Sequence, residues 1–465
     1  MFVGREKELK KLNRMYESDS FEMAVIYGRR RVGKTTLINE FCKGKKTIFF
    51  VGLESVEKEN LQVFSRMVWE TAQPGADMPS FQSFAALFEY VARMAEQERI
   101  ILVIDEYPYL AASCPAVSSV LQACIDHKMK ESKLFLILCG SSMSFMEHQV
   151  LGYKSPLYGR RTAQFKIAPF DFWEARQMLP GFSAEEQALL YGVCGGVPEY
   201  LSHVNYRQSA DENLKDLFFD SSGRLFEEPS NLLKQELRDP SSYNAVLTAI
   251  SNGHSKLNEI AVTVGGSSSS CSNLLTSLIE LGLIKKEYPI TEKEGKKTIY
   301  SFEDQMFRFH FRFVKQNSSV ITAGFGEQLY EKQIRNQLSD FMGPVFEIIC
   351  RDWFFHQLGK DTLPFFFTGI GRWWGGNPAT RKQEEVDLAA VSGSGSQILL
   401  AECKWRKEIT GLPVLEQLRE RSLMFPHQDK YLYLFSKSGF SQECREAAEE
   451  NGNIHLIPFE MMVSL

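Results

Sequence analysis

The chain has 465 residues, 44% of them hydrophobic, and a formal net charge of −5. This length accommodates about three domains, and the net charge provides no overall attraction to nucleic acid, so such contact requires local basic patches. No apolar run reaches the ~18 residues of a membrane helix, the first residues lack the apolar core of a signal peptide, and the nine cysteines form no CxxC pair. These features exclude a membrane span, a disulfide framework and a cysteine zinc site, and we expect a reduced, cytoplasmic protein.

Residues 1–20 predict a polar surface helix, because their apolar side chains recur at helical spacing. The apolar run at residues 23–27 predicts a strand, and residues 28–35, which read GxxxxGKT, follow it directly. An apolar helical pattern begins after them at Leu37. A strand, a glycine loop and a helix in this order are the context that a phosphate-binding P-loop requires.

The chemistry of this loop depends on four residues. Its backbone N–H groups form a concave anion site, and the N-terminal end of the following helix adds positive charge. Gly28 and Gly33 allow backbone angles and a close approach that a Cβ would forbid. Lys34 can reach the β- and γ-phosphates, and the Thr35 hydroxyl can bind Mg²⁺. The sequence therefore predicts ATP and Mg²⁺ as cofactors.

Residues 100–104 form an unbroken apolar run, rich in β-branched residues, that ends in Asp105 and Glu106. Such a run predicts a strand that is buried on both faces of a parallel sheet. Because the strands of a P-loop sheet end beside the phosphates, Asp105 is predicted to hold Mg²⁺, and Glu106 to orient and activate the attacking water. Without the loop, the same pair reads equally well as a solvated acidic turn.

Further strands are predicted at residues 47–51, 133–140 and 164–167, and residues 58–97 predict helices. Ser141 follows the second of these strands. Its hydroxyl either contacts the γ-phosphate or the water, or caps a helix.

Two later motifs have both a structural and a functional interpretation. Arg160 and Arg161 are either surface arginines, or one of them stabilises the transition state as an arginine finger, within the chain or across a subunit interface. Residues 170–237 are helical by pattern and contain Gly-Gly followed shortly by Pro198. This interruption predicts either a plain corner between two helices or a corner that lets a helical lid approach the nucleotide.

Together these motifs resemble the archaeal-type ATPase family, in the broader AAA+/STAND group of P-loop proteins. The resemblance spans roughly residues 1–235 and rests on motifs at residues 2–6, 28–35, 105–106, 155–162 and 195–198. It implies a parallel sheet in which the strand with the acidic pair lies beside the P-loop strand, a helical lid, an arginine finger and a homo-oligomer. The residues predicted to contact the nucleotide are Gly28, Arg29, Arg30, Arg31, Val32, Gly33, Lys34, Thr35, Thr36, Asp105 and Pro198.

Residues 238–315 predict three helices and two short strands, the pattern of a winged helix. Serines at 267–270 and nearby lysines can contact DNA phosphates, but glutamates lie among these lysines, and winged helices also bind proteins. DNA and a protein partner therefore both stay open. His310 is predicted to be a packing residue. The lysines are Lys285, Lys286, Lys296 and Lys297.

Polar residues 317–319 predict a linker, and a third domain is predicted over residues 326–465. Gly343 and the proline after it predict the start of a helix, with Glu347 near its N-terminus. Residues 365–368 predict a strand.

Residues 385–391 and 397–405 predict a β-hairpin around a Ser/Gly turn. Asp387 and Glu402 lie about equally far from this turn, so the hairpin brings them together, while Glu402 and Lys404 share a face. The patch is either a cross-strand salt bridge of Asp387 with Lys404, or a site for Mg²⁺ or Mn²⁺, which prefer carboxylate oxygens. In the second case the lysine positions or activates a water, or stabilises developing negative charge.

This D-x₁₄-E-x-K spacing across a hairpin resembles the PD-(D/E)XK nuclease superfamily, although no proline precedes Asp387. Domains of this kind also occur behind archaeal-type ATPases. The resemblance implies a metal site at Asp387 and Glu402, with Lys404 in catalysis. Glu347 matches the helical acid that some members add, and Gln417 lies where some members place a supporting glutamine.

The sequence thus predicts an α/β protein with a P-loop NTPase parallel sheet and helical lid, then a winged helix, then an α/β restriction-endonuclease-like domain. The predicted bounds are residues 1–168, 169–237, 238–315 and 326–465. The first predicted function is an ATPase that is also a metal-dependent DNA endonuclease. The alternative is a nucleotide-dependent switch or transcription-type regulator whose C-terminal domain binds nucleic acid or protein without cleaving it.

Overall fold

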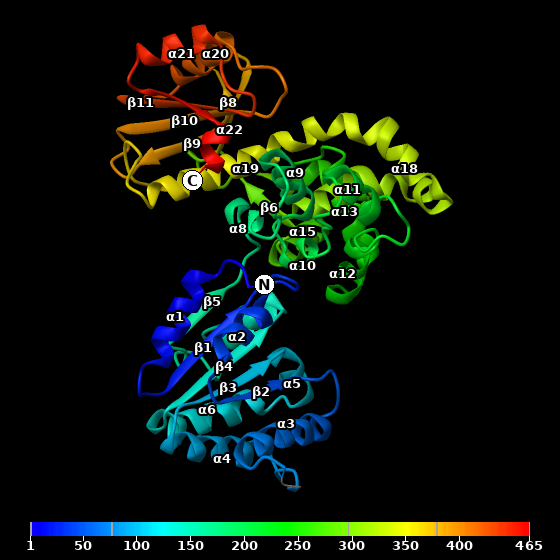
Figure 1. The fold of residues 1–465 in the computed structure, drawn as a ribbon, viewed down its shortest axis with the longest axis vertical. Coiled ribbons are helices and arrows are strands. Elements are labelled where there is room, and N and C mark those ends of the chain that lie inside the picture. Colours follow the sequence, from blue (N-terminus) through cyan, green and yellow to red (C-terminus); the bar gives the residue numbers. More distant parts are fainter. Residues whose placement is uncertain (1, 76–77, 296, 378–379, 465) are drawn as a thin grey trace. The chain divides into compact units, whose positions relative to one another are not determined.

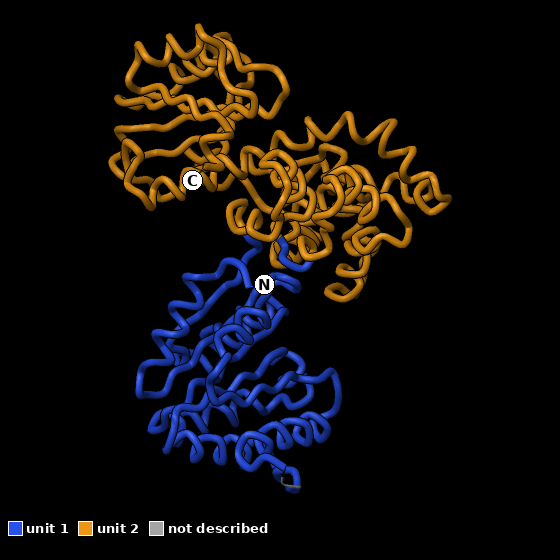
Figure 2. Tube along the Cα trace, in the orientation of Figure 1, with its two compact units in different colours: residues 1–170, 197–199 blue, residues 171–196, 200–465 orange. Residues whose placement is uncertain are grey.

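The computed structural model divides into two compact units, each with its own β-sheet and hydrophobic core (Figure 2). The first unit comprises Met1–Phe170 with Val197–Glu199, and the second comprises Asp171–Gly196 with Tyr200–Leu465. The structure describes residues 2–75, 78–295, 297–377 and 380–464.

The first unit is built around a five-stranded parallel sheet in the order β2-β3-β4-β1-β5 (Figure 1). Its inner strands are continuous apolar runs, as expected for a sheet that is covered on both faces. The α/β class with a parallel P-loop-type sheet is therefore confirmed. The strands are β1 (Glu22–Tyr27), β2 (Thr47–Val51), β3 (Ile100–Asp105), β4 (Leu134–Gly140) and β5 (Ala163–Lys166).

Helices cover both faces of this sheet. Because successive strand residues point to opposite faces, Ala24 and Ile26 of β1 pack against α1 and α2, whereas Val25 and Tyr27 belong to the core with α3 to α7. The helices are α1 (Glu6–Tyr16), α2 (Lys34–Cys42), α3 (Glu57–Ala72), α4 (Phe84–Gln97), α5 (Tyr107–Ser113), α6 (Val117–His127) and α7 (Met143–Phe145).

The expected neighbour of the P-loop strand was wrong. β4 lies between β1 and β3, so the strand that carries the acidic pair is one position further away. The apolar pattern of β3 indicates that the strand is buried, but the crossover connections decide its neighbours. Since all these strands are parallel, their carboxyl ends still meet at one edge of the sheet.

The second unit begins with the helices expected over residues 170–237. Capping boxes start α8, α9 and α11, as with Ser183 and Glu186 at α9. Gly195, with a φ of 69°, ends α9 in the left-handed conformation that glycine favours. The helices are α8 (Phe172–Arg176), α9 (Ala184–Cys194), α10 (Pro198–Leu201), α11 (Ala210–Phe218) and α12 (Glu228–Glu236). The first two residues of α10 belong to the first unit.

The three helices and two strands expected next are present, and the strands β6 and β7 pair antiparallel. Lys296, one of the lysines predicted to contact DNA, lies outside the described residues. The elements are α13 (Pro240–Ser251), α14 (Leu257–Val264), α15 (Ser268–Glu280), β6 (Ile284–Glu287) and β7 (Ile299–Phe302).

The linker expected at residues 317–319 was wrong, because this stretch is helical. Phe313, Val314 and Ile321 are buried on either side of it, so its polar residues lie on the solvent face of a continuing helical path. The path bends at Gly324, which has a φ of 87°. Its parts are α16 (Gln305–Phe309), α17 (Ser318–Val320), α18 (Gly326–Leu329) and α19 (Leu338–Leu358), joined by short 3₁₀ and π segments.

The predicted start of a helix at Gly343 was also wrong, since α19 begins five residues earlier and contains Pro344. The proline cannot donate to the carbonyl of Asp340, an exposed residue whose carbonyl can turn to solvent. Glu347 therefore lies well inside α19 rather than near its N-terminus. His310 is buried against Phe311, and burial lowers its pKa to about 3, so its role in packing is confirmed.

The C-terminal part holds a mixed sheet in the order β12-β11-β10-β9-β8. α19 packs on one face through Trp353 and Phe354 against Tyr433 and Phe435, and α20 with α21 covers the other face. Its elements are β8 (Phe367–Gly376), β9 (Gln383–Ser392), β10 (Gln397–Lys404), α20 (Leu412–Ser422), β11 (Asp429–Ser436), α21 (Gln442–Glu449), β12 (Ile454–Pro458) and α22 (Phe459–Val463).

The predicted hairpin is confirmed. β9 and β10 pair antiparallel as far as Ala401 opposite Leu388, and beyond this pair the Asp387 carboxylate accepts from the backbone N–H of Cys403. β10 then connects through α20 to the parallel strand β11. Among the described residues, no single helix has the length and apolar composition of a membrane span, and one bent pair of helices passes on those two criteria alone.

Candidate functional site

Two glycines set the shape of the loop between β1 and α2. A Cβ on Gly28 would lie 2.3 Å from the carbonyl oxygen of Ile167, so no side chain fits there. Gly33 has a φ of 87°, and Arg31 adopts a positive φ of 73°. The loop therefore turns back on itself ahead of α2, as an anion-binding loop must.

Lys34 and Thr35 open α2 and point toward the edge of the sheet where the strands end. The Lys34 ammonium donates to the carbonyls of Gly28 and Arg29, at 2.9 Å each. The Thr35 hydroxyl donates to Oδ2 of Asp105 at 2.8 Å, which joins the loop to the end of β3 across β4. The P-loop and the acidic strand thus form one site, although they are not neighbours in the sheet.

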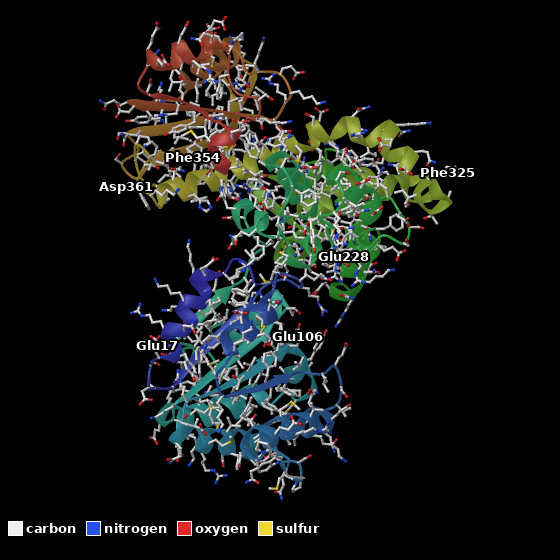
Figure 3. The ribbon with its side chains drawn as sticks, viewed as in Figure 1. Glu17, Glu106, Glu228, Phe325, Phe354 and Asp361 are labelled. Atoms are coloured by element: carbon white, nitrogen blue, oxygen red, sulfur yellow. The ribbon has the colours of Figure 1, made fainter. Side chains whose placement is uncertain are left out.

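Glu106, labelled in Figure 3, follows β3 in a left-handed conformation with a φ of 47°. Its backbone N–H donates to Oδ1 of Asp105 at 2.9 Å. The hydroxyl of Ser141, at the end of β4, donates to the Glu106 carboxylate at 3.0 Å. Of the two interpretations open for Ser141, its hydroxyl here contacts the acidic pair, and no side-chain cap begins α7.

Burial lowers the pKa of Lys34, while the nearby Cys139, Glu106 and Asp105 act in the opposite direction. The lysine is only 6% exposed, so its charge acts at short range on whatever lies in the loop. Lys34 with the loop N–H groups suits a phosphate chain. The oxygens of Thr35 and Asp105 are the hard donors that Mg²⁺ prefers, so these residues fit an Mg-nucleotide.

The other predicted nucleotide contacts surround this loop. Arg30 donates to the hydroxyl of Tyr109 at 2.8 Å, and Arg31 forms an ion pair with Glu199 at 2.9 Å. Pro198, which belongs to the first unit, lies 3.8 Å from the position that a Cβ on Gly33 would occupy, so this proline lies beside the loop. The carbonyl of Val32 accepts from Arg5, and Thr36 is exposed at the start of α2.

The two candidate finger arginines differ in their surroundings. Nε of Arg160 donates to both carboxylate oxygens of Asp126 in α6, at 3.2 Å each. The guanidinium also donates to the carbonyl of Pro156. These contacts hold the pKa of Asp126 down at about 2. Arg161 is half-buried, and its charge acts on Tyr27 at the end of β1. In this conformation Arg160 contributes to the fold through Asp126 and Pro156.

A second cluster of charges lies at the open end of the β9–β10 hairpin. Oδ2 of Asp387 accepts from the backbone N–H of Cys403 at 2.8 Å, which ties the aspartate across to β10. Lys404 donates to Oε1 of Glu402 at 2.5 Å. The predicted salt bridge of Asp387 with Lys404 is not formed, because the lysine pairs with the glutamate on its own strand.

Arg421 of α20 completes this cluster and was not found from the sequence. It donates to Oε2 of Glu402 at 2.9 Å and to Glu384 at 3.1 Å. Gln417, one turn earlier on the same helix, is exposed. Gln417 and Arg421 are four residues apart and therefore share one face of α20. This spacing could have pointed to Arg421, but it does not indicate which of the two side chains reaches the sheet.

Glu347 of α19 lies close enough to Asp387 of β9 for the two charges to act on each other. Burial and the charge of Asp387 raise its pKa to about 8, while Arg372, 3.8 Å away, opposes this. Burial and the charge of Glu402 raise the pKa of Asp387 to about 6. The structure thus places Asp387 near both Glu347 and Glu402, and Lys404 on Glu402, in spite of the wrong helix start.

Carboxylates that raise each other's pKa fit a cation. Mg²⁺ commonly uses one or two carboxylates plus waters and substrate phosphates, and Asp387 with Glu402 fits that pattern. Within the described residues, however, no group of three or more His, Cys, Asp or Glu side chains is arranged to hold a metal. Both oxygens of Glu402 are engaged, one by Lys404 and the other by Arg421.

Comparison with known families and proteins agrees with this arrangement. Residues 2–204 match the model of an ATPase domain predominantly from Archaea, and residues 310–420 match one of archaeal and bacterial proteins of unknown function. The chain is 35% identical over 409 residues to the uncharacterized protein MJECL04 of Methanocaldococcus jannaschii, covering 87% of this chain and 88% of that one. The chain belongs to the archaeal-type ATPase family. As a member it is an ATP-binding ATPase, and its P-loop and acidic pair lie in the matched domain.

This archaeal-type ATPase is also 25% identical over 258 residues to the uncharacterized ATP-binding protein PYRAB06260 of Pyrococcus abyssi, covering 46% of this chain and 76% of the relative. Among solved structures it is similar to the Walker-type ATPase PABY2304 of Pyrococcus abyssi, with 20% identity and a TM-score of 0.49 over 67% of this chain and 96% of that one. It is likewise similar to the ORC2 protein of Aeropyrum pernix, with 12% identity and a TM-score of 0.44 over 69% and 94%.

Proposed function

We propose that this ATPase works on DNA and that its C-terminal sheet carries a metal-dependent phosphodiesterase centre. The observation that carries the proposal is the convergence of Asp387, Glu402, Lys404 and Glu347 from two strands and one helix. A simple salt bridge between Asp387 and Lys404 would not require a second carboxylate next to Asp387. Asp387 lies near two other carboxylates, and the pKa values of Asp387 and Glu347 are raised, so a cation bound beside Asp387 would relieve this repulsion.

In the first unit, Thr35 and Asp105 would hold Mg²⁺, which neutralises phosphate charge when bound. Glu106 is placed to accept a proton from water and to orient it, and Ser141 fixes the carboxylate by its hydrogen bond. Lys34 would contact the β- and γ-phosphates. Arg161, or Arg160 after release from Asp126, would supply the finger, within the chain or from a second copy.

In the second unit, Asp387 and Glu402 would hold Mg²⁺ or Mn²⁺, which polarises the phosphodiester when bound. Lys404 is placed beside Glu402 to orient water or to stabilise negative charge on the phosphorus oxygens. Arg421 holds Glu402 in place from α20. Glu347, with its raised pKa, is placed to carry a proton at neutral pH.

Plasmid nicking tests this centre directly. Wild type with Mg²⁺ or Mn²⁺ should convert supercoiled plasmid to open circles, and Asp387→Asn and Lys404→Ala should each reduce the rate at least 100-fold. Asp429→Asn, an exposed aspartate at the start of β11 in the same sheet, should cut as wild type does. Equal cutting by Asp387→Asn and wild type, or no cutting by wild type with either metal, would refute the nuclease.

A second candidate function has its own support. α13 to α15 with β6 and β7 form the proposed winged helix, but its described lysines already pair with glutamates: Lys285 with Glu287, Lys286 with Glu294 and Lys297 with Glu292. Such pairing favours a protein-contact module and a nucleotide-dependent switch that does not cleave. Absence of nicking together with ATP-dependent capture of a protein partner would select this alternative.

A homo-oligomer is the remaining part of the proposal. If an arginine of one copy completes the site of the next, ATP turnover per chain should rise with protein concentration. A turnover per chain that stays constant across the assembly range would show that each copy works alone.

A further inference from the structure

A large cavity lies wholly within the second unit, beside the proposed phosphodiesterase centre. Its volume is about 750 Å³, and its lining includes Glu347 and residues of β6, β7 and β8. One wall comes from the strand pair β6–β7 and another from β8, and α13, α16, α19 and residues next to these elements contribute further lining. The cavity therefore reaches Glu347, a residue of that centre, and is lined in part by residues of α13, β6 and β7.

The two main walls are fixed to each other. The backbone N–H of Ile290, in the loop after β6, donates to the carbonyl of Arg372 in β8 at 3.0 Å. The Ile290 side chain also packs on the core of the C-terminal sheet, next to Trp373. These contacts hold the two walls of the cavity in a fixed position relative to each other.

The lining is strongly basic. It contains six basic side chains and two acidic ones, Glu287 and Glu347. Most of the basic groups have carboxylate partners, such as Arg351 with Asp352. The six are Lys285, Lys286, Arg308, Arg312, Arg351 and Arg372.

Arg308 and Arg312 differ from the other four. They lie four residues apart, and in the described part of the chain neither forms an ion pair with a carboxylate. Arg308 donates to Gln305 and to the carbonyl of Phe341, and Arg312 lies over the ring of Phe313. Burial, and then the charge of Arg312, lowers the pKa of Arg308 to about 10. The charge of Glu347 acts on Arg308 in the opposite direction. Two neighbouring cations that have no ion-pair partner among the described carboxylates favour an anion in the cavity.

We propose that this cavity binds a single strand of nucleic acid and leads its backbone to Glu347. Arg308 and Arg312 would contact phosphates, and Trp374, which lines the β8 wall, would stack on a base. The inference rests on the proposed function, because it names the substrate that reaches the proposed centre.

The size of the cavity favours one strand over a duplex. A volume of 750 Å³ equals a cube with an edge of about 9 Å, whereas the major groove of B-DNA alone is about 12 Å wide. An aromatic side chain beside basic ones matches the way single strands are bound without sequence preference. The Asp and Glu side chains of an acidic peptide carry no flat ring that could stack on Trp374.

Fluorescence anisotropy in EDTA tests the binding without any cleavage. The probe is fluorescein-labelled oligothymidylate of about 20 nucleotides, longer than the roughly 4–16 that a single-strand module covers. Arg312→Gln should weaken its binding about tenfold and lower the salt slope by about 0.7. Trp374→Ala on the opposite wall should weaken it by a similar factor, and Arg312→Lys should stay within threefold of wild type.

Arg207→Gln is the matched control, since Arg207 is an exposed arginine of the same unit outside the cavity. It should bind within twofold of wild type. The inference is overturned if Arg312→Gln and Trp374→Ala, folded by circular dichroism, bind as wild type does, or if they weaken only the binding of a duplex of the same length.

The two proposals can fail separately. Loss of strand binding in Arg312→Gln, with no nicking by wild type, supports the strand cavity and refutes the nuclease. Nicking by wild type with unchanged strand binding in the cavity variants supports the nuclease and refutes the strand cavity.

Discussion

The two carboxylate sites of this protein are built in opposite ways. At the P-loop, Asp105 and Glu106 accept from the neutral hydroxyls of Thr35 and Ser141. At the hairpin, Glu402 is held by the cations Lys404 and Arg421. Hydroxyl partners leave the negative charge of the first site for Mg²⁺ and phosphate, whereas cationic partners neutralise much of the second site within the protein.

This difference bears on what each site needs in order to act. The first site is assembled from two motifs that follow parallel strands, so its residues are in place once the sheet forms. In the second, a metal held by Asp387 and Glu402 competes with the hold of Arg421 and Lys404 on the same carboxylate. We therefore expect that substitutions at the first site reduce ATP turnover strongly. Substitutions that remove an ion pair at the second site should lower the stability of the second unit.

The largest effect is expected at Lys34. Lys34→Ala removes a buried cation that reaches the loop carbonyls, and should reduce ATP turnover about 1,000-fold, near the upper end seen when one preorganised charge is lost. Phosphate release measures this. Lys43→Ala, an exposed lysine just after α2, should keep wild-type turnover. Unchanged hydrolysis in Lys34→Ala would separate this loop from ATP use.

Glu106→Gln should reduce turnover about 100-fold while nucleotide affinity stays within threefold, because the amide cannot accept a proton from water. A fluorescent ATP analogue measures affinity and phosphate release measures turnover. Equal loss of both would mean that Glu106 supports binding rather than the chemical step. Glu98→Gln, an exposed glutamate of the same unit, is the control.

Arg421→Ala probes the internal pairing of the second site. Removing the guanidinium leaves the buried Glu402 with one cation fewer and should destabilise the second unit by about 2 kcal/mol. Urea unfolding measures this. Arg419→Ala, on the same helix, removes a side chain that donates to the carbonyl of Ala447, and should cost under about 1 kcal/mol. Equal losses would show that Arg421 does not hold the carboxylate.

The smallest effect is a dependence on pH. Burial lowers the pKa of His310 in the folded state to about 3, below the ~6.5 of an unfolded chain. The unfolded state therefore binds more protons between these values, and stability falls as the pH drops below 6.5, by at most about 1.4 kcal/mol per unit.

His310→Gln should lose this part of the pH dependence, and His127→Gln, at an exposed position, should keep it. Thermal unfolding from pH 7 to pH 5.5 compares them, a range in which this contribution stays below about 1.4 kcal/mol. An equally steep decline in His310→Gln would assign the acid sensitivity to other groups.

The sequence predicted local elements better than their ends and neighbours. Cap residues at 317–319 suggested a linker, yet buried residues on both sides carry a helix through it. Gly343 and Pro344 suggested a helix start, yet the proline lies inside α19 where the exposed Asp340 tolerates the lost bond. Both errors have the same cause. Polar residues and proline favour the end or the start of a helix, but the packing of buried neighbours on both sides can override this local preference.

What the sequence by itself determined were the sites whose residues lie close together along the chain. The loop of residues 28–35, the pair Asp105 and Glu106, and the hairpin that joins Asp387 to Glu402 follow from spacing, strand alternation and turn chemistry. Only the tertiary structure decided that β4 separates β1 from β3, that Arg421 grips Glu402, and that Arg160 is engaged by Asp126. These contacts depend on which elements pack together, and a residue pattern records burial and periodicity but not the partner.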